Sequence, residues 1–429
     1  MVLKKWMMPN GLWVSCCEMP DSSLAAVYVY VLGGARVEKD PEAGLAHFLE
    51  HLLFRGSPKY PNEKAVTDFI AKRGGETNAF TSHENIAIYV ETFKEFGEEA
   101  CDILSDVLFK SFFAEEAIAL ERGAVFQEIN NSLDDPDADI GRVFSKLIWG
   151  EHPLGREILG DEAKVKSFTR ESFLDYHSQY FYPANMSLAV AGGLRAEEVF
   201  DLAFKYFYEA PQRRERVRFN DALSPGEART SIVDKDFNQA RCILGSLPQD
   251  WITFKKEHAK DRIASYVLMK ILGGGLGSRL YDSVRSKRGL AYTVYSYLSV
   301  YQDCGSFEVF LGTDADKASE AIRVVKQEFA NMLKDGVTDE EIEKTKNAIR
   351  HDYAKRAGDE GGIAADIASE GLKDSEIMSY ADYFQTHIQP IQKDDIMGVA
   401  RRIFAPDGLR LAVTGKIEKY SQDLQDALN

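Results

Sequence analysis

The chain has 429 residues, and 68 Asp and Glu against 52 Lys and Arg give it a net charge of −16. Hydrophobic residues make up 45% of the sequence and aromatic residues 11%, a composition that is typical of packed globular proteins and excludes a disordered chain. The acidic balance argues against binding to nucleic-acid phosphates or to anionic lipid, because both require a basic face.

The N-terminal region shows no pattern of export or membrane insertion. An apolar stretch follows Lys4 and Lys5, but Pro9 interrupts it before it reaches the roughly 7–15 apolar residues of a signal peptide. No window reaches the roughly 18 apolar residues of a membrane helix. The five cysteines are too few and too scattered for a disulfide framework, and their number is odd. We therefore expect a cytoplasmic protein with reduced thiols and no membrane partner.

Strand and helix patterns are mixed in the first half of the chain. Within residues 85–92, Ile86, Ile88 and Val90 recur at every second position, which is the period of a half-buried strand. The other elements that we expect here are strands over residues 13–19 and 25–32 and helices over residues 44–54, 96–108 and 115–132. This mixture favours an α+β fold with a mostly antiparallel sheet over a doubly wound parallel sheet.

Two segments far apart in the chain share one plan. Residues 181–192 and 404–415 carry Phe, Pro, Leu, Ala, Val and Gly at the same relative positions, and each reads as a helix end, a turn and a buried strand. We infer a duplication into two homologous domains, residues 1–209 and 229–429, joined by a polar linker over residues 210–228. The alternative is a surface loop within one large domain.

His47, Glu50 and His51 form the pattern His-x-x-Glu-His in the middle of the helix predicted over residues 44–54. His47 and His51 are one turn apart, so they share a face and can bind one ion. Glu50 lies near the same edge, where a carboxylate can take a proton from a water molecule that a metal has acidified. The alternative is two unrelated histidines on an amphipathic helix.

A zinc site with two histidines needs a third protein ligand, and the helix predicted over residues 115–132 offers two candidates. Glu121 and Glu128 are two turns apart and therefore lie on one face. We expect both carboxylates to point inward, because Ala124 and Val125 share that face. The alternative is a solvated acidic stripe.

Residues 44–57, Gly-Leu-Ala-His-Phe-Leu-Glu-His-Leu-Leu-Phe-Arg-Gly-Ser, resemble the zinc helix of the pitrilysin–insulinase peptidases, whose motif inverts the thermolysin order. The sequence is especially similar to mitochondrial processing peptidase and its bacterial single-chain relatives. The similarity continues through residues 75–82, 120–128, 278–280 and 285–292, so it covers nearly the whole chain. It implies two homologous α+β domains, each a mostly antiparallel sheet packed with helices.

The resemblance also implies roles for the residues of the first domain. His47, His51 and Glu128 would bind one zinc ion per chain, and Glu50 would be the general base. Glu121 matches a family glutamate that supports catalysis without binding the metal. The first domain would therefore be the zinc-binding catalytic domain.

For the substrate, the resemblance implies residues in both domains. Asn78 and Ala79 match the edge strand along which the substrate backbone lies. Arg285 and Tyr292 match a family pair that holds the backbone and polarises the attacked carbonyl, for which their donors are chemically suited. Taken alone, however, the segment favours the alternative, an Arg in a salt bridge and a Tyr in the core.

The second domain does not repeat the metal pattern. Its equivalent helix, over residues 261–272, contains neither His nor Glu, and Lys346 and Tyr353 stand near the positions of Glu121 and Glu128. We therefore expect this domain to bind substrate and no metal.

These patterns lead to one principal prediction of function and two alternatives. The principal prediction is a zinc-dependent metalloendopeptidase that cleaves peptides or unfolded polypeptide segments. The first alternative is a non-catalytic scaffold or regulatory subunit of the same fold. The second is a nucleotide-binding protein built on the glycine-rich residues 273–277, which is disfavoured because the glycines follow a helix and lack a subsequent Gly-Lys-Ser/Thr.

The resemblance also bears on assembly. Chambers in the family are built from four such domains, and this chain has two. We therefore expect a homodimer, with no nucleic-acid partner, in which Arg285 and Tyr292 of one chain can serve the zinc of the other.

Overall fold

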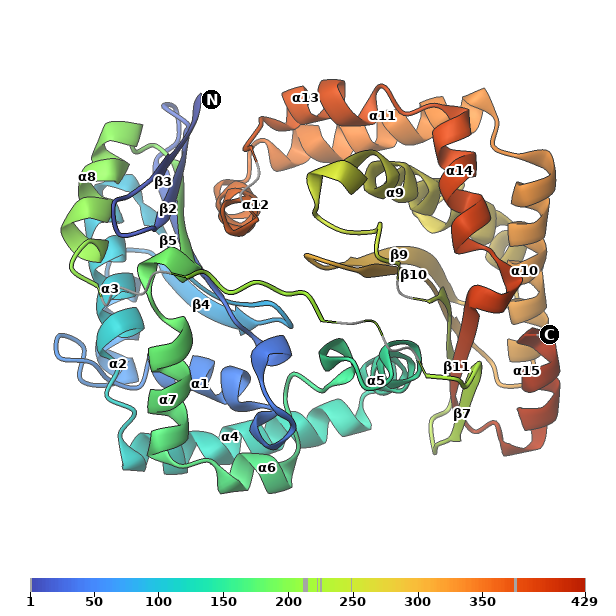
Figure 1. Ribbon diagram of the computed structural model, residues 1–429, viewed down its shortest axis with the longest axis horizontal. Coiled ribbons are helices and arrows are strands. Elements are labelled where there is room, and N and C mark those ends of the chain that lie inside the picture. Colours follow the sequence, from blue (N-terminus) through green and yellow to red (C-terminus); the bar gives the residue numbers. More distant parts are fainter. Residues whose placement is uncertain are drawn as a thin grey trace. The chain divides into compact units, whose positions relative to one another are not determined.

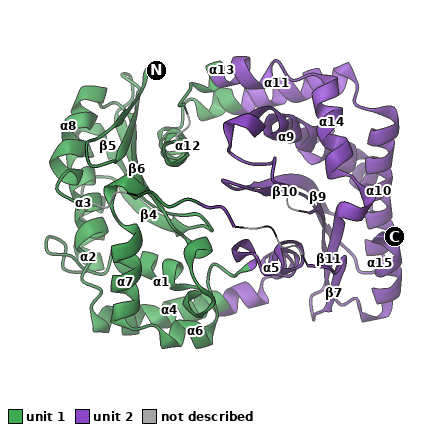
Figure 2. Cartoon of the chain, in the orientation of Figure 1, with its two compact units in different colours: residues 1–129, 156–218, 353–382 green, residues 130–155, 219–352, 383–429 purple. Residues whose placement is uncertain are grey.

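The computed structural model describes residues 2–210, 215–221, 223, 226–247, 249–373 and 376–428 (Figure 1). They divide into two compact units (Figure 2). Unit 1 comprises Met1–Ile129, Arg156–Arg218 and Tyr353–Asp382, and unit 2 comprises Asn130–Gly155, Phe219–Asp352 and Tyr383–Asn429.

Unit 1 is built on a six-stranded sheet with the order β1-β2-β6-β3-β5-β4. The strands are β1 (Val2–Met7), β2 (Trp13–Glu18), β3 (Leu24–Leu32), β4 (Glu76–Thr81), β5 (Asn85–Phe93) and β6 (Met186–Gly192). All neighbours are antiparallel except β2 and β6. The strands expected over residues 13–19, 25–32 and 85–92 are confirmed, and so is the mostly antiparallel sheet.

Helices cover both faces of this sheet (Figure 1). The helices of unit 1 are α1 (Leu45–Leu53), α2 (Glu63–Ala71), α3 (Gly97–Lys110), α6 (Glu162–Ser167), α7 (Arg170–Tyr180), α8 (Ala196–Phe207) and α12 (Glu360–Leu372), together with most of α4 (Glu115–Asp134). Val27, Val29 and Val31 of β3 point into the core with α1 and α3. Helix α12 packs on β2, β3 and β6. The three helices predicted here begin and end within two residues of α1, α3 and α4.

Unit 2 repeats the plan with five strands in the order β7-β11-β8-β10-β9. They are β7 (Thr230–Asp234), β8 (Ala240–Ser246), β9 (Thr293–Val300), β10 (Gly305–Thr313) and β11 (Leu409–Gly415). Only β7 and β11 are parallel, as only β2 and β6 are in unit 1. Each strand of unit 2 therefore has a counterpart in unit 1 at the same position and in the same direction, with β1 as the additional strand of unit 1, which confirms two homologous α+β domains.

The helices of unit 2 are α5 (Pro136–Trp149), α9 (Ala259–Gly273), α10 (Ala318–Asp335), α14 (Lys393–Ile403) and α15 (Ser421–Leu428), together with most of α11 (Asp339–Arg356). The short helix α13 (Tyr380–Tyr383) lies where the chain passes from unit 1 to unit 2. The shared segment found in the sequence has one structure in both copies. Helices α7 and α14 each end before a 3₁₀ turn, Pro183–Asn185 or Pro406–Gly408, that leads into the buried strand β6 or β11.

The two halves of the sequence exchange one helix each. Helix α5 follows α4 in the first half but packs on β7, β8 and β11 of unit 2, and α12 follows α11 in the second half but packs on the sheet of unit 1. The compact units therefore differ from the continuous halves 1–209 and 229–429 by this exchange of helices. The boundaries of those halves stay a prediction. Of the expected linker, residues 211–214, 222, 224 and 225 lie outside the described residues.

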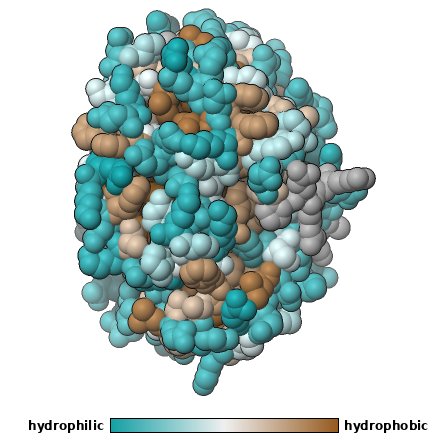
Figure 3. All heavy atoms as spheres, turned by 90° about the vertical axis from the view of Figure 1, so that its left-hand side faces the viewer, coloured by the Kyte–Doolittle hydropathy of each residue, from teal (hydrophilic) through white to brown (hydrophobic). Residues whose placement is uncertain are grey.

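Three further properties concern the cysteines, the length and hydropathy of the helices, and the surface. Cys16, Cys17, Cys101, Cys242 and Cys304 are all buried, and none of these five forms a disulfide bond. Within the described ranges, no helix is both long enough and apolar enough to cross a membrane. Hydrophilic residues predominate on the face shown in Figure 3, where hydrophobic residues form small separate groups.

Candidate metal centre

The N-terminus of helix α1 is fixed by a buried carboxylate. Glu38 accepts hydrogen bonds from the backbone N–H of Gly44 (3.1 Å) and Ala46 (2.6 Å), which would otherwise lack helical partners. Gly44 has φ 97°, and a Cβ there would lie 2.6 Å from the carbonyl oxygen of Leu159, so only glycine fits. Phe48 is fully buried in the core. This arrangement sets the direction in which the opposite, histidine-bearing face points.

His47, His51 and Glu128 converge from α1 and α4 of unit 1. The Nε2 atoms of His47 and His51 lie 3.3 and 3.4 Å from Oε2 of Glu128. The three ligand atoms all lie within 4.8 Å of one another, and no other such group of three occurs in the described part of the chain. The His47 side chain is 10% exposed and the Glu128 side chain 45%, so the group is accessible from the Glu128 side.

The spacing of these atoms suits zinc. Zinc bonds of about 2.0–2.2 Å in a tetrahedral arrangement place neighbouring ligand atoms about 3.3–3.5 Å apart. The two measured separations from Glu128 match this spacing. Two imidazole nitrogens and one carboxylate oxygen are also a ligand set that zinc accepts, and three protein ligands leave one position for water. The residues therefore fit the metal that the sequence predicts.

Glu121 lies behind His51 and does not join the ligand group. Its Oε2 is 3.3 Å from Nδ1 of His51, and its Oε1 is 2.8 Å from Nη2 of Arg55. A carboxylate on the second nitrogen of a metal-binding histidine fixes the tautomer and orientation of the ring. Burial lowers the pKa of His51, but the hydrogen bond with Glu121 and the neighbouring carboxylates outweigh it, so the net pKa is raised.

The prediction that Glu121 and Glu128 share an inward face of α4 with Ala124 and Val125 is only partly right. Ile118, Glu121, Val125 and Ile129 form the buried stripe of this helix, whereas Ala124 is exposed. The expected sharing of the face with Ala124 is wrong because the 3.6-residue period carries that position away from the core. Glu128 lies at the edge of the stripe. The hydrogen bond with His47 is the largest influence on its pKa, which is lowered despite partial burial.

Glu50 lies next to the ligand group and is held by a different element. Its Oε2 accepts a hydrogen bond of 2.7 Å from the hydroxyl of Thr81, the last residue of β4. Burial raises the pKa of Glu50, and the Thr81 hydrogen bond offsets part of the rise. Sequence reasoning missed Thr81, although it lies within the family-like residues 75–82.

Asn78 and Ala79 lie in the middle of β4, at one end of the six-stranded order. Ala79 packs against the core, whereas Asn78 is exposed on the opposite face. Among the described residues β4 pairs only with β5, so its other edge is open to a further strand.

Arg285 and Tyr292 belong to unit 2, whereas the metal group belongs to unit 1. Arg285 lies on the π-helix Tyr281–Ser286 with its guanidinium 5.1 Å from the ring centre of Tyr281. Tyr292 directly precedes β9, and its side chain is exposed, at 61%. The alternative of a core tyrosine is therefore wrong.

The second-half counterparts of the glutamates have structural partners. Lys346 is buried on α11 and donates hydrogen bonds to the carbonyl oxygens of Gln389 (2.6 Å) and Ile391 (2.8 Å). Tyr353 stacks on Tyr380 with ring centres 5.4 Å apart.

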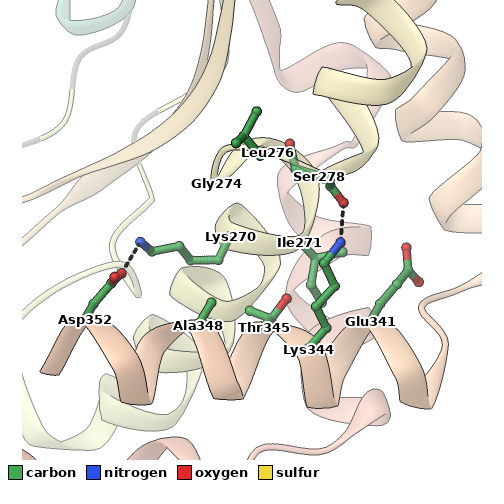
Figure 4. A pocket seen from close by; sticks show the side chains of 11 residues that line it. Lys270, Ile271, Gly274, Leu276, Ser278, Glu341, Lys344, Thr345, Ala348 and Asp352 are labelled. Atoms are coloured by element: carbon green, nitrogen blue, oxygen red, sulfur yellow. Dashed lines mark hydrogen bonds and ion pairs between the residues drawn. The ribbon is translucent and has the colours of Figure 1, made fainter. Parts of the chain in front are cut away.

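The glycine-rich residues 273–277 form a turn at the end of helix α9, as the sequence indicates. The turn borders a pocket of about 160 Å³ between α9 and α11 (Figure 4). Lys344 donates a hydrogen bond to the carbonyl oxygen of Gly277 (2.8 Å), and Lys270 pairs with Asp352 (3.2 Å). Both lysines that line the pocket thus have protein partners, which gives a nucleotide-binding loop no support.

Fold and site together define a class of duplicated α+β proteins with one inverted His-x-x-Glu-His centre. Residues 15–162 match the model of the insulinase family (peptidase family M16), and residues 167–349 match the model of the peptidase M16 inactive domain. The chain belongs to the insulinase family, peptidase family M16.

Individual relatives agree with this assignment. An uncharacterized zinc protease of Rickettsia felis is 33% identical over 402 residues, which cover 92% of this chain and 93% of the relative. The uncharacterized zinc protease YmxG of Bacillus subtilis is 29% identical over 421 residues, which cover 95% and 97%. The crystal structure of a protease from Helicobacter pylori has the same fold, with a TM-score of 0.87 at 21% identity over 96% of this chain and 99% of that one.

Proposed function

We propose that this protein is a zinc-dependent endopeptidase that hydrolyses peptides or unfolded polypeptide segments. The observation that carries the proposal is the convergence of His47, His51 and Glu128, in which both histidine Nε2 atoms lie 3.3–3.4 Å from Oε2 of Glu128, with the carboxylate of Glu50 beside them. The names of the relatives, zinc proteases, support the same activity.

Glu50 has the position and the chemistry of a general base. A zinc ion held by the three ligands would supply a Lewis acid and an acidified water molecule. Glu50 then takes a proton from the attacking water and gives it to the departing amine. Burial raises the pKa of Glu50, which favours uptake of the proton, and Thr81 holds Oε2 while the other oxygen is left for the water. Glu121 supports this step by orienting His51.

The substrate is proposed to add as a strand beside β4. Asn78 and Ala79 lie on this edge strand, whose backbone groups can pair with any peptide regardless of its side chains. Such binding gives loose sequence preference and suits internal cleavage. Arg285 and Tyr292 are proposed to bind the substrate backbone and to stabilise the charge on the carbonyl oxygen; both are exposed in unit 2.

A non-catalytic scaffold is the second candidate, because residues 167–349 match a domain described as inactive. That stretch excludes all four residues of the metal centre. His47, Glu50, His51 and Glu128 are all present and assembled, so the enzyme is the better-supported function.

Assembly and location are part of the proposal. We propose a closed homodimer, since an enclosed site would exclude water and strengthen the carbonyl-polarising donors. Buried cysteines without disulfide bonds suit a reducing compartment, so the proposed location is the cytoplasm.

The test is metal content together with peptide cleavage. The purified protein is expected to contain about one zinc per chain, to cleave unstructured peptides, to lose activity with a strong chelator and to regain it with zinc. His51→Ala and Glu128→Ala should each lose the metal, whereas Glu116→Ala, an exposed carboxylate on the same helix as Glu128, should keep it. Wild-type protein that binds no zinc would contradict the proposal.

A further inference from the structure

We propose that Arg55 is a positioning residue of the metal centre, which holds Glu121 in place so that Glu121 orients His51 towards the metal. This inference rests on the proposed function, because it assumes that His51 binds a metal. It concerns a side chain that lies outside the His-x-x-Glu-His motif and touches none of the three ligands directly.

The geometry forms a chain of three side chains. Arg55 lies just beyond the end of α1, where its N–H donates to the carbonyl oxygen of Leu52 at 3.1 Å. Its guanidinium turns back to α4, with Nη2 2.8 Å from Oε1 of Glu121, and the other oxygen of Glu121 is 3.3 Å from Nδ1 of His51. Nη1 of Arg55 pairs with Glu63 at the start of α2, which holds the guanidinium from its outer side.

The burial of Glu121 makes a cation necessary. Its side chain is 3% exposed, and a buried carboxylate without a partner is strongly unfavourable. Within the described residues, Arg55 and His51 are the basic side chains that pair with Glu121. A histidine that binds a metal through Nε2 is neutral and carries its proton on Nδ1, so it offers Glu121 a hydrogen bond but no charge. Arg55 is then the cation that stabilises the Glu121 carboxylate.

Removal of the guanidinium should therefore weaken metal binding through Glu121. In Arg55→Met the carboxylate loses its fixed partner, and His51 loses an acceptor held in one place. Loss of such outer contacts typically lowers metal affinity 10–100-fold. Arg55→Lys keeps a cation that can reach Glu121 with one hydrogen bond and should lose about threefold to tenfold.

The experiment measures the affinity of each variant for zinc alone, by competition with a chromophoric chelator. Arg55→Met is expected to bind zinc 10–100-fold more weakly than wild type, with Arg55→Lys between them. Glu63→Gln, which removes only the outer partner of Arg55, is the matched control and should stay within about threefold of wild type. In the Glu121→Gln background, Arg55→Met should lower zinc affinity by less than about threefold, because its effect passes through Glu121.

Several outcomes would overturn the inference. Equal zinc affinity of Arg55→Met and wild type would do so, as would no recovery in Arg55→Lys. Fully additive losses in the double variant would assign Arg55 a general structural role instead. Absence of zinc binding in the wild type would overturn the proposed function, which distinguishes the two failures.

Discussion

The position of helix α1, which carries His47 and His51, depends on a single buried carboxylate, that of Glu38. It receives the N–H groups of Gly44 and Ala46 at the start of α1 and is almost fully enclosed. Burial raises its pKa to about 8, against the lowering effect of the two backbone hydrogen bonds. The folded chain therefore holds a proton on Glu38 at pH values where the unfolded chain has released it.

The stability of the protein should consequently fall as the pH rises through this range. Because the folded pKa of about 8 exceeds the ordinary value of 4.5, the contribution of Glu38 is full below about pH 4.5 and is lost as the pH approaches 8. The slope from one group is at most about 1.4 kcal/mol per pH unit. Chemical unfolding of metal-free wild type and Glu38→Gln between pH 5 and 9 tests this. The variant should show the weaker pH dependence, and equal slopes would contradict the assignment.

Sequence alone predicted the grouping of the candidate metal ligands better than the contacts of the side chains around them. The pair His47 and His51 lies within one helix, so its spacing determines that the two rings share a face. Thr81 and Arg55 were not predicted from sequence, since their contacts with Glu50 and Glu121 depend on how β4 and α4 pack against α1. Such contacts between distant segments leave no periodic pattern.

Among the elements, α12 depends most visibly on close packing. A Cβ on Gly371 would lie 2.1 Å from Oγ of the fully buried Ser187 on β6. On α14, by contrast, a Cβ on Gly398 would meet nothing within 4 Å. The two glycines therefore allow a direct comparison between a tightly packed helix position and an open one in the same protein.

Alanine at these two positions should have opposite effects. Gly371→Ala should lower the free energy of unfolding by about 1–3 kcal/mol, because the core there has no room for a methyl group. Gly398→Ala should raise it by about 0.5–1 kcal/mol, because alanine restricts the unfolded chain and favours the helix. Denaturant unfolding of both variants measures the difference, and stabilisation by Gly371→Ala would show that α12 packs less tightly than described.

Some elements were predictable and others were not, for physical reasons. Strand β5 has a buried face, so its alternation is visible in the sequence. Strand β1 was not predicted, because none of its residues is fully buried and it pairs only with β2 among the described strands. The amphipathic pattern of α5 and α12 indicates a buried face but not which sheet it covers, so the exchange between halves could not be foreseen.

At the scale of the whole molecule, the chain has two similar folds but, among the described residues, one candidate metal centre. The strand orders of the two sheets correspond, yet Lys346, which the sequence repeat puts near the position of Glu121, donates hydrogen bonds to backbone carbonyls. The repeat of residues 181–192 and 404–415 predicted this duplication correctly. Divergence of the second copy is consistent with the separate role proposed for Arg285 and Tyr292.

Mixing of two inactive variants tests the proposed homodimer and shared sites. Glu50→Gln and Tyr292→Phe chains should each have little or no activity alone. In a mixed dimer with shared sites, one of the two sites combines an intact Glu50 with an intact Tyr292, so activity should reappear after subunit exchange. A fully active monomer at working concentration would remove the dimer. No recovery in a proven mixed dimer would place both residues in the same chain.

The most direct test of the central claim is the Glu50→Gln variant, measured for zinc content and peptide turnover in the same preparation. Glu50 lies beside the ligand group and is held by Thr81 without being one of the three ligands. The variant should therefore retain about one zinc per chain, while turnover falls by a factor of about 10² to 10⁴, the usual contribution of a general base. Near-normal turnover in a zinc-loaded Glu50→Gln protein would contradict the role of Glu50 and the mechanism built on it.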